Sequence, residues 1–182
     1  MISVYDNFLP ANVFEGVVKK IKSLDFMSAT NHPDITKDSH EHWPGVRTKL
    51  LSTVAETTDR IILKSINNTG NKFLWGAYDY KLYAHLKLAT DKGEDYIHQD
   101  GDWDFAFLYY LSETNLNSGT KFYFNDEDKN NEHTLVKFVQ NRLLIYDAKM
   151  PHCPWGKYGN NLSDGRLTLN GFGKSQWVNS KT

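Results

Sequence analysis

The sequence predicts a mainly β protein, a sandwich or barrel with flanking helices, and two patterns lead to that expectation. After residue 73 the chain consists of short runs rich in aromatic and aliphatic residues, separated by clusters of Gly, Asn, Asp and Pro, as in all-β folds. Before residue 70, apolar residues recur every three or four positions, as on one face of an amphipathic helix. We therefore expect two N-terminal helices packed on one sheet of a β core.

The N-terminal part of the chain, about residues 1–70, is expected to supply a first strand and both helices. Residues 2–8 alternate loosely and predict the strand, and a proline then opens a helix over residues 10–24. The second helix is expected over residues 50–66, which end in an Asn-Asn-Thr-Gly stretch. Residues 28–47 lie between the helices and have the composition of a long irregular loop.

The β core is expected over about residues 71–175. Its candidate strands are residues 73–88, 98–100, 105–111, 121–124, 135–139, 142–146 and 166–172. Residues 126–133 are charged and predict a solvated hairpin tip. Because a chain of 182 residues without repeats or a linker suits one folding unit, we expect a single domain over residues 1–182.

The composition excludes several classes of protein. The chain is 40% hydrophobic and 14% aromatic, as in a folded protein, and its formal charge of −1 provides no basic excess for nucleic acid or an anionic membrane. Cys153 is the only cysteine, which excludes an internal disulfide and a thiolate zinc site. The N-terminus lacks signal-peptide features, and no apolar stretch approaches the ~20 residues of a membrane helix, so we expect a soluble, cytoplasmic protein.

His98 and Asp100 are the first candidate metal ligands. On an extended strand, side chains two residues apart point the same way, so this pair offers an imidazole nitrogen and a carboxylate oxygen to one point. His152, which follows Pro151, is the candidate third ligand. Two His and one carboxylate leave about three positions open on an octahedral metal, the arrangement of non-haem Fe(II) oxygenases.

The order of these motifs resembles the Fe(II)/2-oxoglutarate-dependent dioxygenases, and within them the prolyl-4-hydroxylase-like branch. The signature of that family is His-x-Asp, then a distal His, then a basic residue one strand later, which here are His98-Gln99-Asp100, His152 and Arg166. Arg166-Leu167-Thr168 also matches the Arg-x-Ser/Thr pattern of many members. The resemblance covers about residues 80–173 and implies a double-stranded β-helix, a jelly roll or cupin-like barrel.

The resemblance further implies an enzyme that uses Fe(II), 2-oxoglutarate and O2, with ascorbate as a further candidate cofactor. Decarboxylation of 2-oxoglutarate to succinate would accompany hydroxylation of a C–H bond in a small-molecule or peptidyl substrate. Arg166 suits the distal carboxylate of 2-oxoglutarate because a guanidinium binds a carboxylate through two parallel hydrogen bonds. Thr168 shares its strand face, and Tyr110 falls where related enzymes place a tyrosine hydroxyl on the same carboxylate. The implied catalytic metal ligands are His98, Asp100 and His152.

Each of these residues also has a purely structural interpretation. His98 and Asp100 can belong to a surface turn, and His152 can be a capped turn histidine. Arg166 can pair with Asp164 or a Glu on the sheet surface, and Tyr110 can fill the core. Residues 40–42, His-Glu-His, are a rival metal-binding group without a clear third ligand. At the level of function, the alternatives are a catalytically silent β-helix binding domain and a cupin-like metalloenzyme that does not use 2-oxoglutarate.

The loop over residues 31–47 is expected to cover the mouth of the barrel and to help bind the substrate. Trp43 and Arg47 flank a rigid Pro-Gly turn, and loops on a β scaffold commonly carry recognition residues. Trp43 could stack on a substrate ring and Arg47 could pair with a carboxylate or peptide carbonyl. The alternative is that Trp43 fills the gap between the helices and the sheet.

Overall fold

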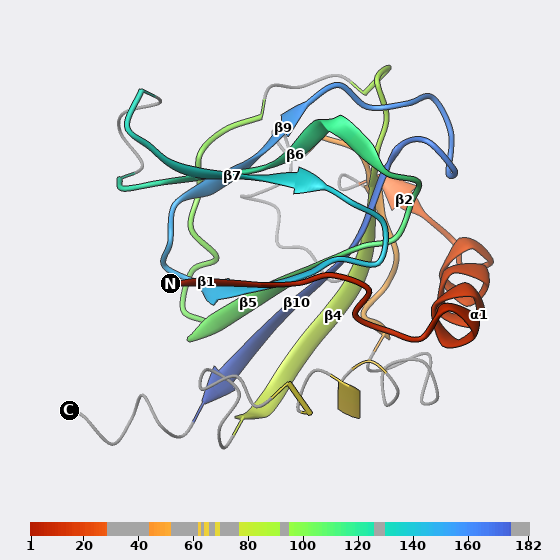
Figure 1. Cartoon of the computed structure of the whole chain (residues 1–182), viewed down its shortest axis with the longest axis horizontal. Helices are drawn as coiled ribbons and strands as arrows, with labels where there is room; N and C mark the ends of the chain where they lie inside the picture. The colour runs from red at the N-terminus through yellow and green to blue at the C-terminus, as the bar shows by residue number, and fades with distance from the viewer. Residues whose placement is uncertain are drawn as a thin grey trace.

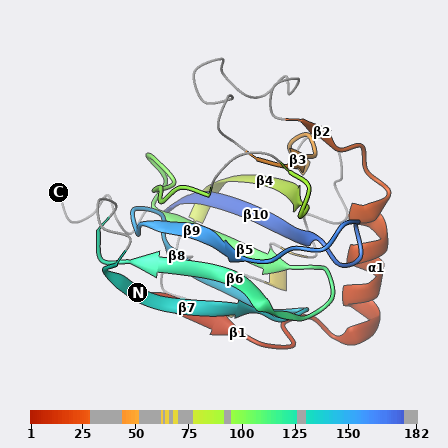
Figure 2. The same ribbon diagram turned by 90° about the horizontal axis from the view of Figure 1, so that it is seen from above.

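In a computed structural model of the chain, two antiparallel β-sheets lie face to face and one helix packs at their side (Figures 1 and 2). The residues that the structure describes are 1–28, 44–51, 62, 64–65, 68–69, 77–91, 95–125 and 130–175. The large sheet has the strand order β1-β8-β5-β10-β4-β3-β2, and the small sheet has the order β7-β6-β9. This two-sheet jelly roll confirms the expected mainly β fold.

The helix is α1 (Ala11–Lys22), and the strands follow in chain order. Their bounds are β1 (Ile2–Tyr5), β2 (Met27–Ser28), β3 (Val46–Arg47), β4 (Ala77–Lys87), β5 (Phe105–Tyr110), β6 (Asn115–Tyr123), β7 (Glu132–Phe138), β8 (Leu143–Asp147), β9 (His152–Gly156) and β10 (Arg166–Ser175). No helix among these residues has the length and apolar character needed to cross a bilayer.

The sequence of strand β5 is continuously apolar because both faces of the strand are buried. All six of its residues are buried, because both faces of the large sheet are covered. Phe105, Phe107 and Tyr109 face the side on which α1 packs, whereas Leu108 and Tyr110 face the small sheet. The alternation along the strand therefore separates two hydrophobic clusters instead of a buried and a solvated face.

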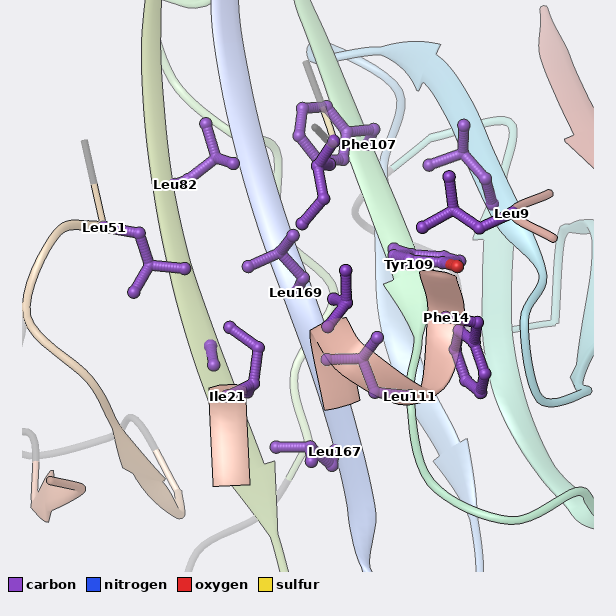
Figure 3. Close-up of a cluster of buried hydrophobic side chains, with 14 of the residues drawn as sticks. Leu9, Phe14, Ile21, Leu51, Leu82, Phe107, Tyr109, Leu111, Leu167 and Leu169 are labelled. Carbon is purple, nitrogen blue, oxygen red and sulfur yellow. The ribbon is translucent and has the colours of Figure 1, made fainter. Parts of the chain in front are cut away.

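Helix α1 covers one face of the large sheet. Its apolar side buries Phe14, Val17 and Ile21, and lysines in its last turn suit the negative end of the helix dipole. The ring of Phe14 meets that of Tyr109 edge to face at 5.9 Å between centroids, as Figure 3 shows within the larger cluster. The helix therefore supports the back of the sheet whose other face looks toward β6, β7 and β9.

Two glycines on β10 allow aromatic side chains of β5 to pack against the β10 backbone on this face of the large sheet. A Cβ atom at Gly171 would overlap the ring of Phe107, and one at Gly173 would overlap the ring of Phe105. The phenyl rings of β5 thus lie directly against the backbone of the neighbouring strand. Any larger residue at these positions would force the two strands or their rings to move.

The N-terminal part agrees with expectation in part. Of the two expected helices, the described residues contain one, α1; the second, expected over 50–66, falls largely outside them, and the described residues 62 and 64–65 are helical, with Ile62 buried. The expected irregular segment 28–47 is wrong at its described ends: Met27–Ser28 (β2) pairs with Val46–Arg47 (β3), and β3 pairs with β4. Hydrogen bonds to the edge of the large sheet make these residues extended strands, although their composition is typical of a loop.

Candidate metal centre

The three expected metal ligands are held together by backbone pairing. The N–H of His98 donates to the carbonyl of His152 at 3.0 Å, and the N–H of His152 donates back at 2.9 Å. The N–H of Asp100 donates to the carbonyl of Ala148 at 2.8 Å. These bonds fix the register between two distant segments, so the three side chains converge regardless of the loops between them.

The ligand atoms lie close enough to share one metal ion. One ligand atom from each of His98, Asp100 and His152 lies within 4.8 Å of the other two. Nε2 of His98 is 3.9 Å from Asp100 Oδ1, and Nε2 of His152 is 3.6 Å from Asp100 Oδ2. Neighbouring ligands of an octahedral ion with ~2.1 Å bonds are about 3 Å apart, so small side-chain rotations would complete the set.

Both imidazole rings are oriented by the backbone carbonyl of the residue two positions earlier in the chain. Nδ1 of His98 faces the carbonyl of Tyr96 at 3.1 Å, and Nδ1 of His152 faces the carbonyl of Met150 at 2.9 Å. A carbonyl oxygen only accepts, so the proton of each neutral ring must be on Nδ1. The lone pair of each Nε2 is then directed into the site, as a metal ligand requires.

Burial sets the charge states that a metal site needs. Desolvation lowers the pKa of His98 to about 4, with a further lowering from the nearby His152, and lowers the pKa of His152 to about 4. Desolvation raises the pKa of Asp100 to about 6. At neutral pH both imidazoles are therefore uncharged and the carboxylate is ionised, which are the forms that bind metals.

Beside two of the three ligands a cavity opens between the sheets, with about 470 Å³ of empty space that includes open solvent at its mouth. His98 and His152 line it directly, together with apolar residues at its walls and mouth, among them Leu108 and Pro154. Its remaining lining residues are Pro44, His85, Lys87, Asp95, Tyr96, Thr120, Arg166 and Asn170. A metal at the triad would thus lie beside a cavity that polar and charged side chains also line.

Arg166 provides an uncompensated cation in the wall of this cavity. The residue is 3% exposed, and its Nη2 donates to Thr120 Oγ1 at 3.0 Å. No carboxylate in the described ranges pairs with it, and its buried Nε has no hydrogen-bond partner there. The interpretation of Arg166 as a surface cation paired with Asp164 is therefore wrong. A buried guanidinium with an unused donor points to an anionic ligand.

A second cation stands beside Arg166. Lys87 of β4 is its direct cross-strand partner and is also 3% exposed. The ammonium of Lys87 pairs with the carboxylate of Asp95, which also accepts a hydrogen bond from the Tyr158 hydroxyl at 2.9 Å. Asp95 therefore compensates Lys87 and leaves the charge of Arg166 unbalanced, which strengthens the case for a bound anion.

The other expected cofactor residues lie near Arg166 but differ in what they contact. The hydroxyl of Tyr110 is 2.8 Å from Thr120 Oγ1, so Tyr110, Thr120 and Arg166 form one chain of hydrogen bonds. Thr168 is fully buried, and its hydroxyl donates to Asn170 Oδ1 at 2.7 Å instead of lining the cavity. A cofactor role for Tyr110 and Thr168 remains a prediction. Thr120, which the sequence analysis did not single out, is the residue whose hydroxyl accepts the hydrogen bond of Arg166.

Of the expected substrate residues and the loop over residues 31–47, the structure describes only residues 44–47, which include Arg47. Arg47 lies on the edge strand β3, with its guanidinium over the ring of Tyr83 at 4.8 Å, and does not line the cavity. Its role in substrate binding remains a prediction. Trp43 and the rival His-Glu-His group at 40–42 lie outside the described residues.

Several site residues were not found by sequence analysis. The hydroxyl of Tyr146 lies 3.3 Å from Asp100 Oδ2 and 3.2 Å from His152 Nε2. His85, expected only to pack in the sheet, lines the cavity with Nε2 2.8 Å from the Pro44 carbonyl, and burial lowers its pKa to about 3. The signal for Tyr146 was its position at the end of a strand that leads directly into the turn before His152.

The fold recurs in solved structures of low sequence identity. A prolyl-4-hydroxylase from Pseudomonas putida superposes with a TM-score of 0.65 at 16% identity, over 96% of this chain and 92% of its own. A prolyl hydroxylase from Trichoplax adhaerens, solved with a hypoxia-inducible-factor peptide fragment, gives 0.70 at 12% identity, over 98% and 86%. HygX from Streptomyces hygroscopicus, solved with nickel and 2-oxoglutarate bound, gives 0.67 at 12% identity, over 96% and 83%.

These similarities establish the fold of the chain, which agrees with the jelly roll implied by its motifs. By sequence, no protein-family model matches the chain and no curated protein matches it.

Proposed function

We propose that this chain is an Fe(II)- and 2-oxoglutarate-dependent dioxygenase of the prolyl-4-hydroxylase-like branch. The observation that carries the proposal is the shared cavity. A cluster of two neutral imidazoles and one carboxylate lies at one side of it, and a buried, uncompensated Arg166 lies in its wall. A small dicarboxylic acid that chelates a metal at one end would bring its second carboxylate toward such a cation.

The donor set fits Fe(II). His98, Asp100 and His152 offer two nitrogens and one oxygen from one side, which leaves about three coordination positions for other ligands. The Nδ1–H of each ring is held by a backbone carbonyl, so both rings are oriented before a metal arrives. HygX, which shares this fold, was solved with nickel and 2-oxoglutarate bound, which supports the choice of metal-dependent chemistry.

The far end of the cavity fits the distal carboxylate of 2-oxoglutarate. Arg166 would bind it through its guanidinium, with the hydroxyl of Thr120 as a further donor and Tyr110 as the next member of the chain. Thr168 would act more indirectly, because its hydroxyl is committed to Asn170. The burial of Arg166 strengthens the interaction, since little water competes for the guanidinium.

The bound metal and 2-oxoglutarate, with O2, would supply the oxidative chemistry: one oxygen atom of O2 enters succinate as 2-oxoglutarate loses CO2, and the other hydroxylates a C–H bond of the substrate. The chain's residues bind and orient the reactants. The imidazoles stay neutral at neutral pH, and Asp100 carries the negative charge of the ligand set.

The substrate is proposed to be a peptidyl residue or a small molecule that enters past Tyr96, Pro44 and Pro154. Tyr96 is 38% exposed, and all three residues border the cavity. The Trichoplax adhaerens prolyl hydroxylase was solved with a peptide fragment, which supports a peptidyl substrate as the first choice. Hydroxylation of a peptidyl proline is thus the activity to test first.

Anaerobic titration with Fe(II), with and without 2-oxoglutarate, tests the proposal. We expect Fe(II) binding, followed on addition of 2-oxoglutarate by the weak visible charge-transfer band of the chelated complex. Fe(II) binding without that band would favour a cupin-like metalloenzyme, and absence of metal binding would favour a silent binding domain. With O2 admitted, succinate release and the gain of one oxygen by proline-containing peptides would identify the hydroxylase.

A further inference from the structure

The hydroxyl of Tyr146 contacts two of the three proposed metal ligands. It lies 3.3 Å from Asp100 Oδ2 and 3.2 Å from His152 Nε2, on two of the three residues that could hold one metal ion. A buried polar group in hydrogen-bond range of two metal-binding residues acts on the site and not only on the core. The proposed function does not use it.

The ring of Tyr146 is held rigidly. Tyr146 is 1% exposed on strand β8, where it pairs with Ile2 of β1 and with Ala106 of β5. Its ring meets Phe122 edge to face at 5.0 Å between centroids and His152 at 4.9 Å. The hydroxyl therefore occupies a fixed point beside the site, and a Phe substitution would keep the ring packing while it removes the hydroxyl.

The hydroxyl has one proton to donate. In the metal-free site the acceptors are Asp100 Oδ2 and Nε2 of His152, whose ring carries its proton on Nδ1 toward Met150. A metal at the triad would take the Nε2 lone pair of His152, which leaves Asp100 Oδ2 as the acceptor. The Asp100 oxygen that faces His98 is the other one, Oδ1.

We propose that Tyr146 is a positioning residue that donates its hydrogen bond to Asp100 Oδ2 and so makes Asp100 bind the metal through Oδ1 alone. The inference rests on the metal site of the proposed function and extends it. A carboxylate with both oxygens free can bind through one or two, and a second bond would occupy a position needed by other ligands. Tyr146 thereby keeps coordination positions open for 2-oxoglutarate and O2.

Co(II) binding to Tyr146→Phe tests the inference without 2-oxoglutarate or turnover. Loss of a hydrogen-bonding partner behind a metal ligand typically costs 10–100-fold in affinity, so we expect Tyr146→Phe to bind Co(II) at least about tenfold more weakly. We also expect a changed visible Co(II) spectrum, because Asp100 is free to bind through both oxygens. Wild-type affinity together with a wild-type spectrum in Tyr146→Phe would overturn the inference.

Tyr109→Phe is the matched control. Tyr109 is an equally buried tyrosine of the large sheet, but its hydroxyl donates to Asn141 on the face covered by α1, away from the site. We expect this variant to lose some stability and to keep wild-type Co(II) affinity and spectrum. An equal loss of affinity in both variants would show a general packing effect and would overturn the specific role of Tyr146.

A measurement on the unmodified protein separates a hydrogen-bond donor from a fourth ligand, whatever the folding of the variants. On Zn(II) binding, a donor keeps its proton and gives no phenolate absorption in the ultraviolet difference spectrum, whereas a ligating tyrosine gives one. Appearance of the phenolate signal would overturn the inference in favour of direct ligation. Failure of wild-type protein to bind any metal would instead overturn the proposed function, so the two failures are distinguishable.

Discussion

His98 and His152 exchange both of their backbone hydrogen bonds, at 3.0 and 2.9 Å, while their rings lie 4.5 Å apart between centroids. The two proposed ligands are thus direct neighbours in a β-bridge, although they are far apart in the sequence. The bridge fixes the relative positions of their backbones. A site built on paired backbone holds its geometry without the metal. Loss of a ligand side chain should therefore abolish metal binding and leave the fold in place.

We expect His98→Ala, Asp100→Ala and His152→Ala each to abolish iron retention and the uncoupled conversion of 2-oxoglutarate to succinate, since each removes one of three protein ligands. His133→Ala is the control, because His133 is an exposed histidine of β7 outside the cavity. Iron content after anaerobic loading and succinate release are the measurements. Retention of both by His152→Ala would refute the assignment.

We expect Arg166→Ala to raise the 2-oxoglutarate concentration required for half-maximal turnover by roughly a hundredfold or more, because it removes the buried partner of a carboxylate. Arg166→Lys should also be strongly impaired, since a lysine keeps the charge but not the two-pronged geometry. Lys157→Ala is the comparison, as Lys157 is an exposed cation that does not line the cavity. An effect on Lys157→Ala alone would move the anchor there.

The sequence predicted the parts of this structure that local pattern determines. The continuous apolar run at β5 and the His-x-Asp spacing were both readable, because alternation along a strand fixes which side chains share a face. Thr120, Tyr146 and Lys87 were not found, because each reaches the site through cross-strand register or through the facing sheet. The ring orientations of His98 and His152 depend on backbone carbonyls, which no side-chain pattern reveals.

The acid sensitivity of the metal-free protein should depend in part on His85. Burial lowers its pKa to about 3, whereas in the unfolded chain the group titrates near 6.5. Below pH 6.5 the unfolded state therefore binds more protons than the folded state, so the stabilising effect of neutral His85 declines as the pH falls toward 3. Between pH 7.5 and pH 5 this loss amounts to about 2 kcal/mol for one such histidine.

We accordingly expect His85→Gln, which keeps a donor for the Pro44 carbonyl, to lose less free energy of unfolding between pH 7.5 and pH 5 than wild type. Urea unfolding at both pH values, with a chelator present, measures the difference. His133→Gln should lose as much as wild type, because His133 is exposed. Equal losses in wild type and His85→Gln would show that His85 is protonated in the folded protein.

The ion pair between Lys87 and Asp95 should matter for stability far more than an exposed pair of the same chemistry. Lys87 is buried beside the cation Arg166, so Asp95→Asn would leave two adjacent positive charges in the cavity wall with no carboxylate partner among the described residues. Because Asp95 is partly exposed, we expect a cost of about 3 kcal/mol, the lower end for breaking a buried pair, and a melting temperature lower by roughly 5–10 °C.

Two comparisons make this last prediction decisive. Glu132→Gln removes the partner of Lys121 in a more exposed pair at 2.6 Å and should change the melting temperature little, because exposed pairs contribute at most about 1 kcal/mol. Adding Lys87→Met to Asp95→Asn should recover most of the lost stability, since an apolar side chain of similar length needs no counter-ion. An unchanged melting temperature in Asp95→Asn would mean that water or another group stabilises the ammonium of Lys87. Lys87 would then be a second cation, beside Arg166, that could bind an anionic ligand.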